Sequence, residues 1–265
     1  MLENVDEALL SAGGLKVNQS GSVLTISLAR PQSRNAQTPA TWRALSAIAT
    51  SLASDVRVVV LRGEGESFSA GLDKRMFTEG VPGELPLSGM ATLSDGDFDA
   101  AIAGFQHAFT CWRELDAIVI AAVQGHAIGA GFQLALGADM IVVADDAQFS
   151  MKETQLGLVP DLGGTHPLVA AVGYPRALEM CASGRRIGSA EAVSTGIALR
   201  SVAPAALDAE VLSLADSFIT ALPEAVAETK HLLVSAIDSP PSEQVRQERL
   251  SQRRRIAHLA SFLNP

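Results

Sequence analysis

The sequence predicts an α/β fold, and three observations support this prediction. Residues 22–29 alternate apolar and polar side chains as a strand does, residues 38–53 have the apolar spacing of a helix, and residues 56–61 form a continuous apolar run typical of a buried strand. Because strands and helices keep alternating further along the chain, layers of helices against a sheet are favoured over an all-helical bundle. With 265 residues, of which 48% are hydrophobic, the chain can bury one substantial core.

Each expected element has a local signal. Thr38 is a candidate N-cap for the first helix, because a hydroxyl there can accept a free N–H and Pro39 follows it. Further elements are expected as a helix over 98–115, a strand over 117–123, a helix over 130–136, and strands over 140–144 and 148–150. After Pro204, proline signals separate three expected helices over 207–220, 223–237 and 242–262. We therefore expect a core over 1–200 and a C-terminal helical region over 201–265.

The segment 74–97 is rich in Gly, Pro and acidic residues, so we expect a mobile loop there. Two interpretations stay open: the loop is surface decoration, or it is a lid over a binding site.

Composition and charge exclude several classes of protein. A net charge of −9 argues against nonspecific binding to nucleic acid or to an anionic membrane. Cys111 and Cys181 offer neither a disulfide framework nor metal-ligand spacing, so reduced thiols are expected. His107, His126 and His166 also lack metal-ligand spacing, and we expect no metal site. No leader pattern or membrane-spanning apolar run is present, which favours a cytoplasmic protein.

One motif points to chemistry. Residues 120–135, IAAVQGHAIGAGFQLA, join a buried strand through a glycine-rich turn to a helix. The first N–H groups of a helix have no partner within the helix, and the helix dipole favours negative charge there. A second loop, SFSAGLD after the strand 56–61, could expose another amide near Ala70 and Gly71. Two such donors can hold the oxygen of an enolate.

Four blocks of the sequence resemble the crotonase superfamily, the enoyl-CoA hydratase/isomerase family. They are RPQSRNAQ at 30–37, FSAGLD at 68–73, AAVQGHAIGAGFQLAL at 121–136 and FSMKETQLGLVPDLGGTHPL at 149–168. Their order and spacing resemble the family's from about residue 21 to residue 200. The resemblance implies a crotonase-like fold of ββα units in a spiral core, an acyl-CoA thioester substrate, and no cofactor beyond the coenzyme A of that substrate. It also implies a homotrimer or dimer of trimers packed through C-terminal helices.

The resemblance also places the family's functional positions on this chain. The two oxyanion amides fall on Ala70 and Ala130, where Ala130 replaces the more usual glycine; alanine is tolerable there if the position needs no positive φ. Contacts to the substrate are implied for Arg30, Ala36, Ala70, Gly71, Leu72, Asp73 and Gly129.

The acid and base positions depart from the hydratase pattern. Hydratases of this family use two glutamates, and the first position here is Gln133, whose amide cannot take and return a proton. Gln133 either orients water or the thioester, or fills space. The second glutamate is retained as Glu153, the expected general base, with a pKa raised by burial. Asp161 stands eight residues later, as in dienoyl-CoA isomerases, although those enzymes also carry an acid at the Gln133 position; alternatively, Asp161 caps the following turn.

These positions predict a double-bond isomerase acting on an enoyl-CoA or dienoyl-CoA, because one base suffices to move a proton between two carbons. Three alternatives remain. A hydratase is the first, with Asp161 replacing the missing acid. A member that binds acyl-CoA without turnover is the second. A dehalogenase is less favoured, because Glu153 occupies the place of that enzyme's aromatic clamp.

Overall fold

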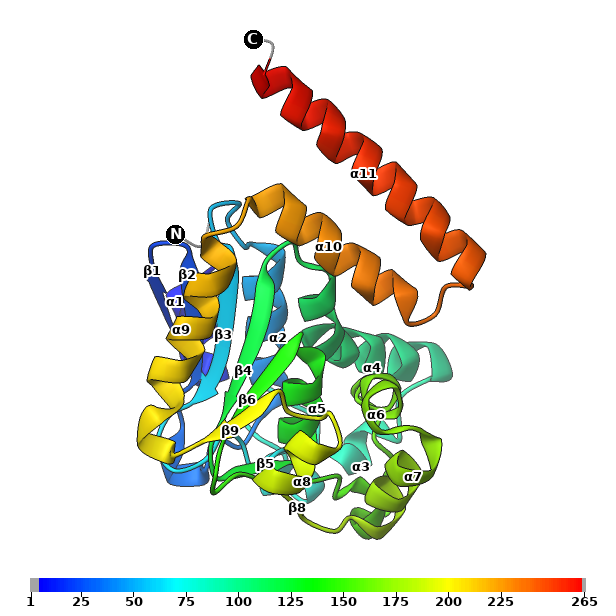
Figure 1. The fold of residues 1–265 in the computed structure, drawn as a ribbon. Helices are drawn as coiled ribbons and strands as arrows, with labels where there is room; N and C mark the ends of the chain where they lie inside the picture. Colours follow the sequence, from blue (N-terminus) through cyan, green and yellow to red (C-terminus); the bar gives the residue numbers. More distant parts are fainter. Residues whose placement is uncertain (1–4, 264–265) are drawn as a thin grey trace.

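The computed structural model describes residues 5–263 and is built around a six-stranded sheet (Figure 1). Its strands are β1 (Leu15–Ser20), β2 (Val23–Leu28), β3 (Val58–Gly63), β4 (Ile118–Val123), β6 (Met140–Ala144) and β9 (Arg200–Val202), in the order β1-β2-β3-β4-β6-β9. Only the β1/β2 pair is antiparallel; the other neighbours run parallel. The predicted α/β fold is confirmed.

A second, three-stranded sheet lies beside the first. It consists of β5 (His126–Ile128), β7 (Gln148–Ser150) and β8 (Ile187–Gly188), with β5 parallel and β8 antiparallel to β7. The chain passes from β4 into β5 and from β6 into β7, so two neighbouring strands of the large sheet continue into neighbouring strands of the small one. This places the segments that follow β5 and β7 next to each other.

Helices bury both faces of the large sheet. On one face lie α1 (Glu7–Gly13), α2 (Pro39–Thr50), α4 (Asp95–Thr110) and α5 (Ala130–Gly137), and on the other lies α9 (Leu207–Ile219). Strand β3 shows the consequence: Val59 and Leu61 belong to one core, and Val58 and Val60 to the other. A strand buried on both faces is apolar throughout, which explains the unbroken run in the sequence.

Several expected boundaries agree with the structure. Thr38 is the N-cap of α2: its side chain accepts from the backbone N–H of Thr41, and the Thr41 side chain accepts from Thr38 N–H. The strands expected at 140–144 and 148–150 are β6 and β7. The sequence reading missed α1, β1, β5, β8 and β9, together with α6 (Thr165–Val172), α7 (Tyr174–Ser183) and α8 (Ser189–Ser194).

The segment 74–97 is not a plain loop. It contains a 3-10 turn over Lys74–Phe77 and a short helix, α3 (Leu87–Met90), and Arg43 of α2 pairs with Glu84. Whether it closes over a ligand stays a prediction.

The C-terminal helices differ in how they meet the body. α9 packs on the sheet, whereas α10 (Pro223–Ala236) crosses one end of it and α11 (Pro241–Leu263) projects away from the body (Figure 1). Lys230 anchors α10, because its buried ammonium pairs with Asp139 at 2.8 Å and donates to the carbonyls of Trp112 and Ala117. A domain boundary after residue 200 stays a prediction. Among residues 5–263, no helix combines the length and apolar character that crossing a membrane requires.

Candidate active site

Two loops predicted to carry the oxyanion amides meet in the structure. Ser69 forms a parallel bridge with Ala127 of β5, so the loop after β3 runs alongside the start of α5. Gly71 has φ +86°, and a Cβ built on it would lie 2.4 Å from the Ile128 carbonyl oxygen and 3.4 Å from the Ala130 nitrogen. This approach requires glycine, and it brings the backbone of 71–72 against the first residue of α5.

The amide that faces the site differs from the expected one. Ala70 N–H donates to the Arg34 carbonyl at 2.8 Å, which takes up its single hydrogen. Gln37 N–H donates to the Gly71 carbonyl at 2.7 Å. In a trans peptide the C=O and the next N–H point in opposite directions, so Leu72 N–H points away from Gln37, and within residues 5–263 it has no acceptor. The role expected for the Ala70 amide therefore fits Leu72.

Ala130 stays our prediction for the second amide. Ala130 is the first residue of α5, where an N–H has no acceptor within the helix. Gly129 takes the positive φ of +53°, and its own N–H donates to the Ser150 carbonyl at 2.8 Å. Because the unusual backbone falls on Gly129, alanine at 130 is not strained. A Cβ on Gly129 would lie 3.3 Å from Glu153 Oε1, which places the Glu153 carboxyl beside this turn.

Gln133 holds Glu153 rather than filling space. Its Nε2 donates to Glu153 Oε1 at 2.7 Å, and its Oε1 accepts from the backbone N–H of Leu162 at 3.0 Å and of Gly164 at 3.2 Å. These bonds fix which end of the amide is oxygen. They also occupy the amides of the turn after Asp161, so Gln133, and not Asp161, caps that turn.

The two carboxyl groups of the site share an apolar environment. Glu153 is buried, and its Oε2 has no hydrogen-bond partner within the described residues. Burial raises the pKa of Glu153 above its usual 4.5, and the charge of Asp161 raises it further. Burial likewise raises the pKa of the half-buried Asp161, whose backbone carbonyl accepts from Gln106 of α4 at 2.7 Å. Both groups therefore hold protons to a higher pH than an exposed carboxyl does.

Some residues expected to bind substrate have structural partners instead. Arg30 is half-buried, and its guanidinium donates to the Ala36 carbonyl at 2.7 Å and to Thr41 Oγ1 at 2.8 Å. Asp73 caps the 3-10 turn that follows it and pairs with Arg75 at 2.7 Å. Both side chains are thus already bonded to other residues of the chain. Backbone atoms of the two loops remain as the candidate contacts to substrate.

The histidines and cysteines have no hydrogen bond to the Glu153 or Asp161 carboxyl among the described residues. His126 Nδ1 lies 3.1 Å from Ser67 Oγ, and His166 pairs with Asp238 of the α10–α11 connection. Both cysteines are free thiols, and burial raises the pKa of Cys111 to about 12. Within residues 5–263, no three His, Cys, Asp or Glu side chains converge as metal ligands.

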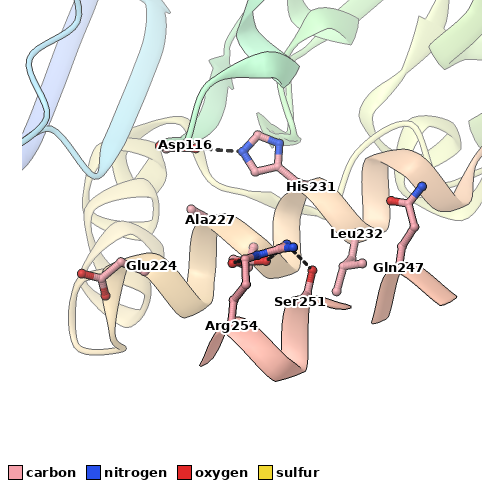
Figure 2. Close-up of a pocket in the computed structure, with 9 residues that line it drawn as sticks. Asp116, Glu224, Ala227, His231, Leu232, Gln247, Ser251 and Arg254 are labelled. Atoms are coloured by element: carbon pink, nitrogen blue, oxygen red, sulfur yellow. Dashed lines mark hydrogen bonds and ion pairs between the residues drawn. The ribbon is translucent and has the colours of Figure 1, made fainter. Parts of the chain in front are cut away.

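A separate cavity of about 400 Å³ lies between α10, α11 and Asp116. Figure 2 shows His231 facing Asp116, which it contacts at 2.8 Å, and Arg254 beside Ser251. Arg254 Nε also donates to Glu228 at 2.9 Å. Because these groups satisfy each other, this cavity does not compete with the Glu153 cluster as a candidate active site.

Comparison with known proteins agrees with the geometry. The chain matches the enoyl-CoA hydratase/isomerase family over residues 18–261. It is 37% identical to the carnitinyl-CoA dehydratase of Escherichia coli (strain K12) over 236 residues, which cover 88% of this chain and 84% of the relative.

Solved structures give the same result. A putative enoyl-CoA hydratase from Thermobifida fusca YX in complex with CoA superposes with a TM-score of 0.92 at 43% identity, over 98% of this chain and 100% of that one. A structure described in the same words, in complex with acetoacetyl-CoA, gives a TM-score of 0.90 at 44% identity, over 96% and 98% of the two chains. The chain therefore belongs to the enoyl-CoA hydratase/isomerase family.

Proposed function

We propose that this enzyme shifts a double bond of an enoyl-CoA or dienoyl-CoA through a thioester enolate, with Glu153 as the base. The observation that carries the proposal is the state of Gln133. Its Oε1 already accepts two backbone N–H groups and its Nε2 donates to Glu153, so Gln133 neither titrates nor has a free acceptor that could take a proton from water. Glu153 is then the one carboxyl held beside the Ala130 turn, with one oxygen anchored and the other unpartnered.

The step needs no co-reactant. Glu153 carboxylate removes a proton from C2 of a 3-enoyl thioester, and the electrons move through the C3–C4 double bond when the proton returns at C4. The negative charge that develops on the thioester oxygen accepts hydrogen bonds from Leu72 N–H and Ala130 N–H. A base with a raised pKa suits this task, because it accepts a proton from carbon more readily than an ordinary carboxylate does.

Asp161 supports the dienoyl version of the reaction. Its carboxyl lies near enough to Glu153 to raise the pKa of that group, and its own pKa is raised by burial. Two such carboxyls can serve opposite ends of a conjugated acyl chain, one removing a proton and the other supplying one.

Hydration of a 2-enoyl-CoA, or the reverse dehydration, is the second candidate. It is favoured by the same Asp161 carboxyl, which could supply the acid that Gln133 lacks, and by the name of the similar carnitinyl-CoA dehydratase. Binding of a CoA thioester is supported by the similar structures that hold CoA and acetoacetyl-CoA, and we assign its CoA portion to the backbones of 30–36 and 70–73.

Absorbance of the conjugated thioester distinguishes the reactions. Purified protein is supplied with 3-enoyl-CoA and, separately, with 2-enoyl-CoA of short and long chains. We expect absorbance to rise with the 3-enoyl substrate. A fall with the 2-enoyl substrate, with 3-hydroxyacyl-CoA recovered, establishes hydration instead. Saturable binding without any product supports a member that binds acyl-CoA without turnover.

Three variants assign the groups. Glu153→Gln is expected to abolish turnover, and Asp116→Asn, which alters a surface carboxyl at the other cavity, is expected to leave it unchanged. If Asp161→Asn retains activity, Glu153 acts alone; if it loses activity, two acids are required. Turnover that survives Glu153→Gln would remove Glu153 from the mechanism.

A further inference from the structure

A buried polar network lies behind the peptide that joins Gly71 to Leu72. Trp42 Nε1 donates to Gln37 Oε1 at 2.8 Å, and Gln37 Nε2 donates to Ser69 Oγ at 3.0 Å. Both Gln37 and Ser69 are 0% exposed, so neither side chain can contact a substrate in this conformation. Buried polar groups are costly unless they are paired, and here each side-chain nitrogen and oxygen of the three residues has at least one partner.

The Ser69 hydroxyl has a single possible arrangement. It donates its proton to the Asn35 carbonyl at 2.8 Å, and its two lone pairs accept from Gln37 Nε2 and from Gly71 N–H at 3.2 Å. A hydroxyl has one donor and two acceptor sites, so all three are filled. The Gly71 N–H is thereby held in one direction.

Gln37 holds the same segment from its backbone. Its N–H donates to the Gly71 carbonyl at 2.7 Å, and its carbonyl accepts from Asp73 N–H at 2.8 Å. Ser69 thus fixes the peptide before Gly71, and Gln37 fixes the peptide after it. The N–H left over between these anchors is that of Leu72.

We propose that Ser69 and Gln37 are positioning residues that aim the Leu72 N–H at the enolate oxygen. The inference rests on the proposed function, because it assigns that amide to the enolate. A donor stabilises an oxyanion only where it is already aimed when the charge develops, since realignment during the reaction costs free energy. The network supplies this alignment through groups that do not touch the substrate.

The network extends to the other side of the site. The Trp42 ring packs on Phe105 and Phe109 of α4, with centroids 4.9 Å and 5.7 Å apart. Gln106 on the same helix donates to the Asp161 carbonyl. Helix α4 therefore contacts both the network behind the Leu72 amide and the turn that carries Asp161.

The test compares two buried serines. Ser69→Ala removes the hydroxyl that fixes Gly71, whereas Ser189→Ala removes a hydroxyl at the start of α8 that donates to the carbonyl of Asp145, the residue after β6. Each variant is measured for kcat and KM with the enoyl-CoA substrate, for its thermal midpoint, and for the ultraviolet band of enolate when acetoacetyl-CoA is bound.

For Ser69→Ala we expect kcat to fall roughly 10- to 100-fold with KM little changed. A misdirected amide stabilises the negative charge of the transition state less well, whereas the uncharged thioester of the bound substrate depends on that amide less. The enolate band should weaken in parallel. Trp42→Phe keeps an aromatic side chain but removes the indole N–H together with part of the buried ring, so it should lower kcat and the band in the same direction and also lower the thermal midpoint. Ser189→Ala should change neither kcat nor the band.

The outcomes separate this inference from the proposed function. A wild-type chain that forms the enolate band but turns over no enoyl-CoA defeats the proposed isomerisation, and loss of the band in Ser69→Ala still supports the positioning role. If Ser69→Ala lowers the thermal midpoint as Ser189→Ala does and keeps both kcat and the band, Ser69 is structural only. A wild-type chain that binds acetoacetyl-CoA without the band overturns the inference, since the Leu72 amide then stabilises no enolate.

Discussion

The Glu153 carboxyl is anchored at one oxygen and unpartnered at the other. An unpartnered carboxylate oxygen away from water disfavours the charged form, which is why burial raises the pKa of this group. The arrangement costs stability and gains reactivity, as is common where a group must exchange a proton. Two predictions follow at the level of this residue.

The first concerns stability and pH. The pKa of Glu153 is higher in the folded chain than its usual 4.5. Between these two pKa values the folded chain retains a proton that the unfolded chain has released. Stability therefore falls as pH rises through this window. Glu153→Gln cannot lose this proton. Its thermal midpoint should therefore exceed that of the wild type above the window and converge with it below.

Glu179→Gln provides a control of opposite sign, since the Arg185 guanidinium lowers the pKa of Glu179 and the wild-type carboxylate is the favoured form. A midpoint of Glu153→Gln that stays below the wild type at every pH would contradict the assigned cost of burial.

The second concerns catalysis and pH. The acidic limb of kcat/KM should lie above pH 4.5, because the Glu153 base must be deprotonated in the free enzyme. The negative charge of Asp161 raises the pKa of Glu153, so Asp161→Asn should move this limb to lower pH even where it lowers the rate. A profile of kcat/KM against pH for both proteins checks the direction, and a limb that moves upward would show that the two groups are not coupled in this way.

At the level of elements, close backbone approach decides where the catalytic loops sit. Gly71→Ala should unfold or inactivate the protein, because its Cβ would meet the Ile128 carbonyl oxygen at 2.4 Å. Gly83→Ala is the matched control: it has a similar positive φ of +82° and nothing within 4 Å of the added Cβ. The control should cost about 1–2 kcal/mol from backbone strain alone. Urea unfolding of both variants separates strain from collision, and equal losses would exclude collision as the cause.

The docking of α10 gives a second prediction at this level. Lys230→Met leaves the Asp139 carboxylate with little solvent and without its ammonium partner, so unfolding free energy should fall by about 3–5 kcal/mol. Arg254→Met removes an exposed partner of Glu228 and should lower the unfolding free energy far less, because water screens an exposed ion pair. Denaturant titration measures both, and comparable losses would mean that the buried pair does not anchor α10.

Elements with strong apolar patterns were predictable, and short or exposed ones were not. β3 and β4 lie between two helical layers, so β4 is apolar throughout and β3 is apolar from Val58 to Leu61. β1 is an edge strand with Leu15 as its one buried residue, and α7 buries only Ala177 and Met180, so neither shows a clear period. Packing against the rest of the chain, which local sequence does not encode, decides such elements.

The same limit applies to the site. Glu153, Gln133 and the Ala130 turn could be placed from motifs, because their chemistry depends on residue type. The choice between the amides of Ala70 and Leu72 depends on hydrogen bonds to Arg34 and Gln37 that no spacing rule reveals. In an extended segment every second N–H points to the same side, so the sequence could at most have named the amides of Ala70 and Leu72 as two candidates for the oxyanion donor.

At the scale of the whole molecule, α11 is a helix whose apolar side chains are largely not covered by the rest of its own chain. It leaves the body after Pro241, and its apolar side chains are largely exposed, from 41% at Leu250 to 57% at Ile256. It also carries five arginines against two glutamates, in a chain whose net charge is −9.

A homotrimer or dimer of trimers therefore stays our prediction for the assembly. Light scattering should return three or six times the chain mass of 27.6 kDa, and a variant ending before Pro241 should return a smaller multiple. A chain that runs as a monomer at all concentrations would contradict the prediction. The thermal midpoint of the shortened variant tests whether the body folds without α11.

The bond between Gln133 and Glu153 also bears on how this enzyme can change over evolutionary time. Glutamine and glutamate codons differ at a single base, so one mutation exchanges the Gln133 amide for an acid. Two carboxyl oxygens 2.7 Å apart would have to share a proton and titrate as a pair. A single nucleotide change would therefore add a second acid beside Glu153, and the backbone of the site would not have to move.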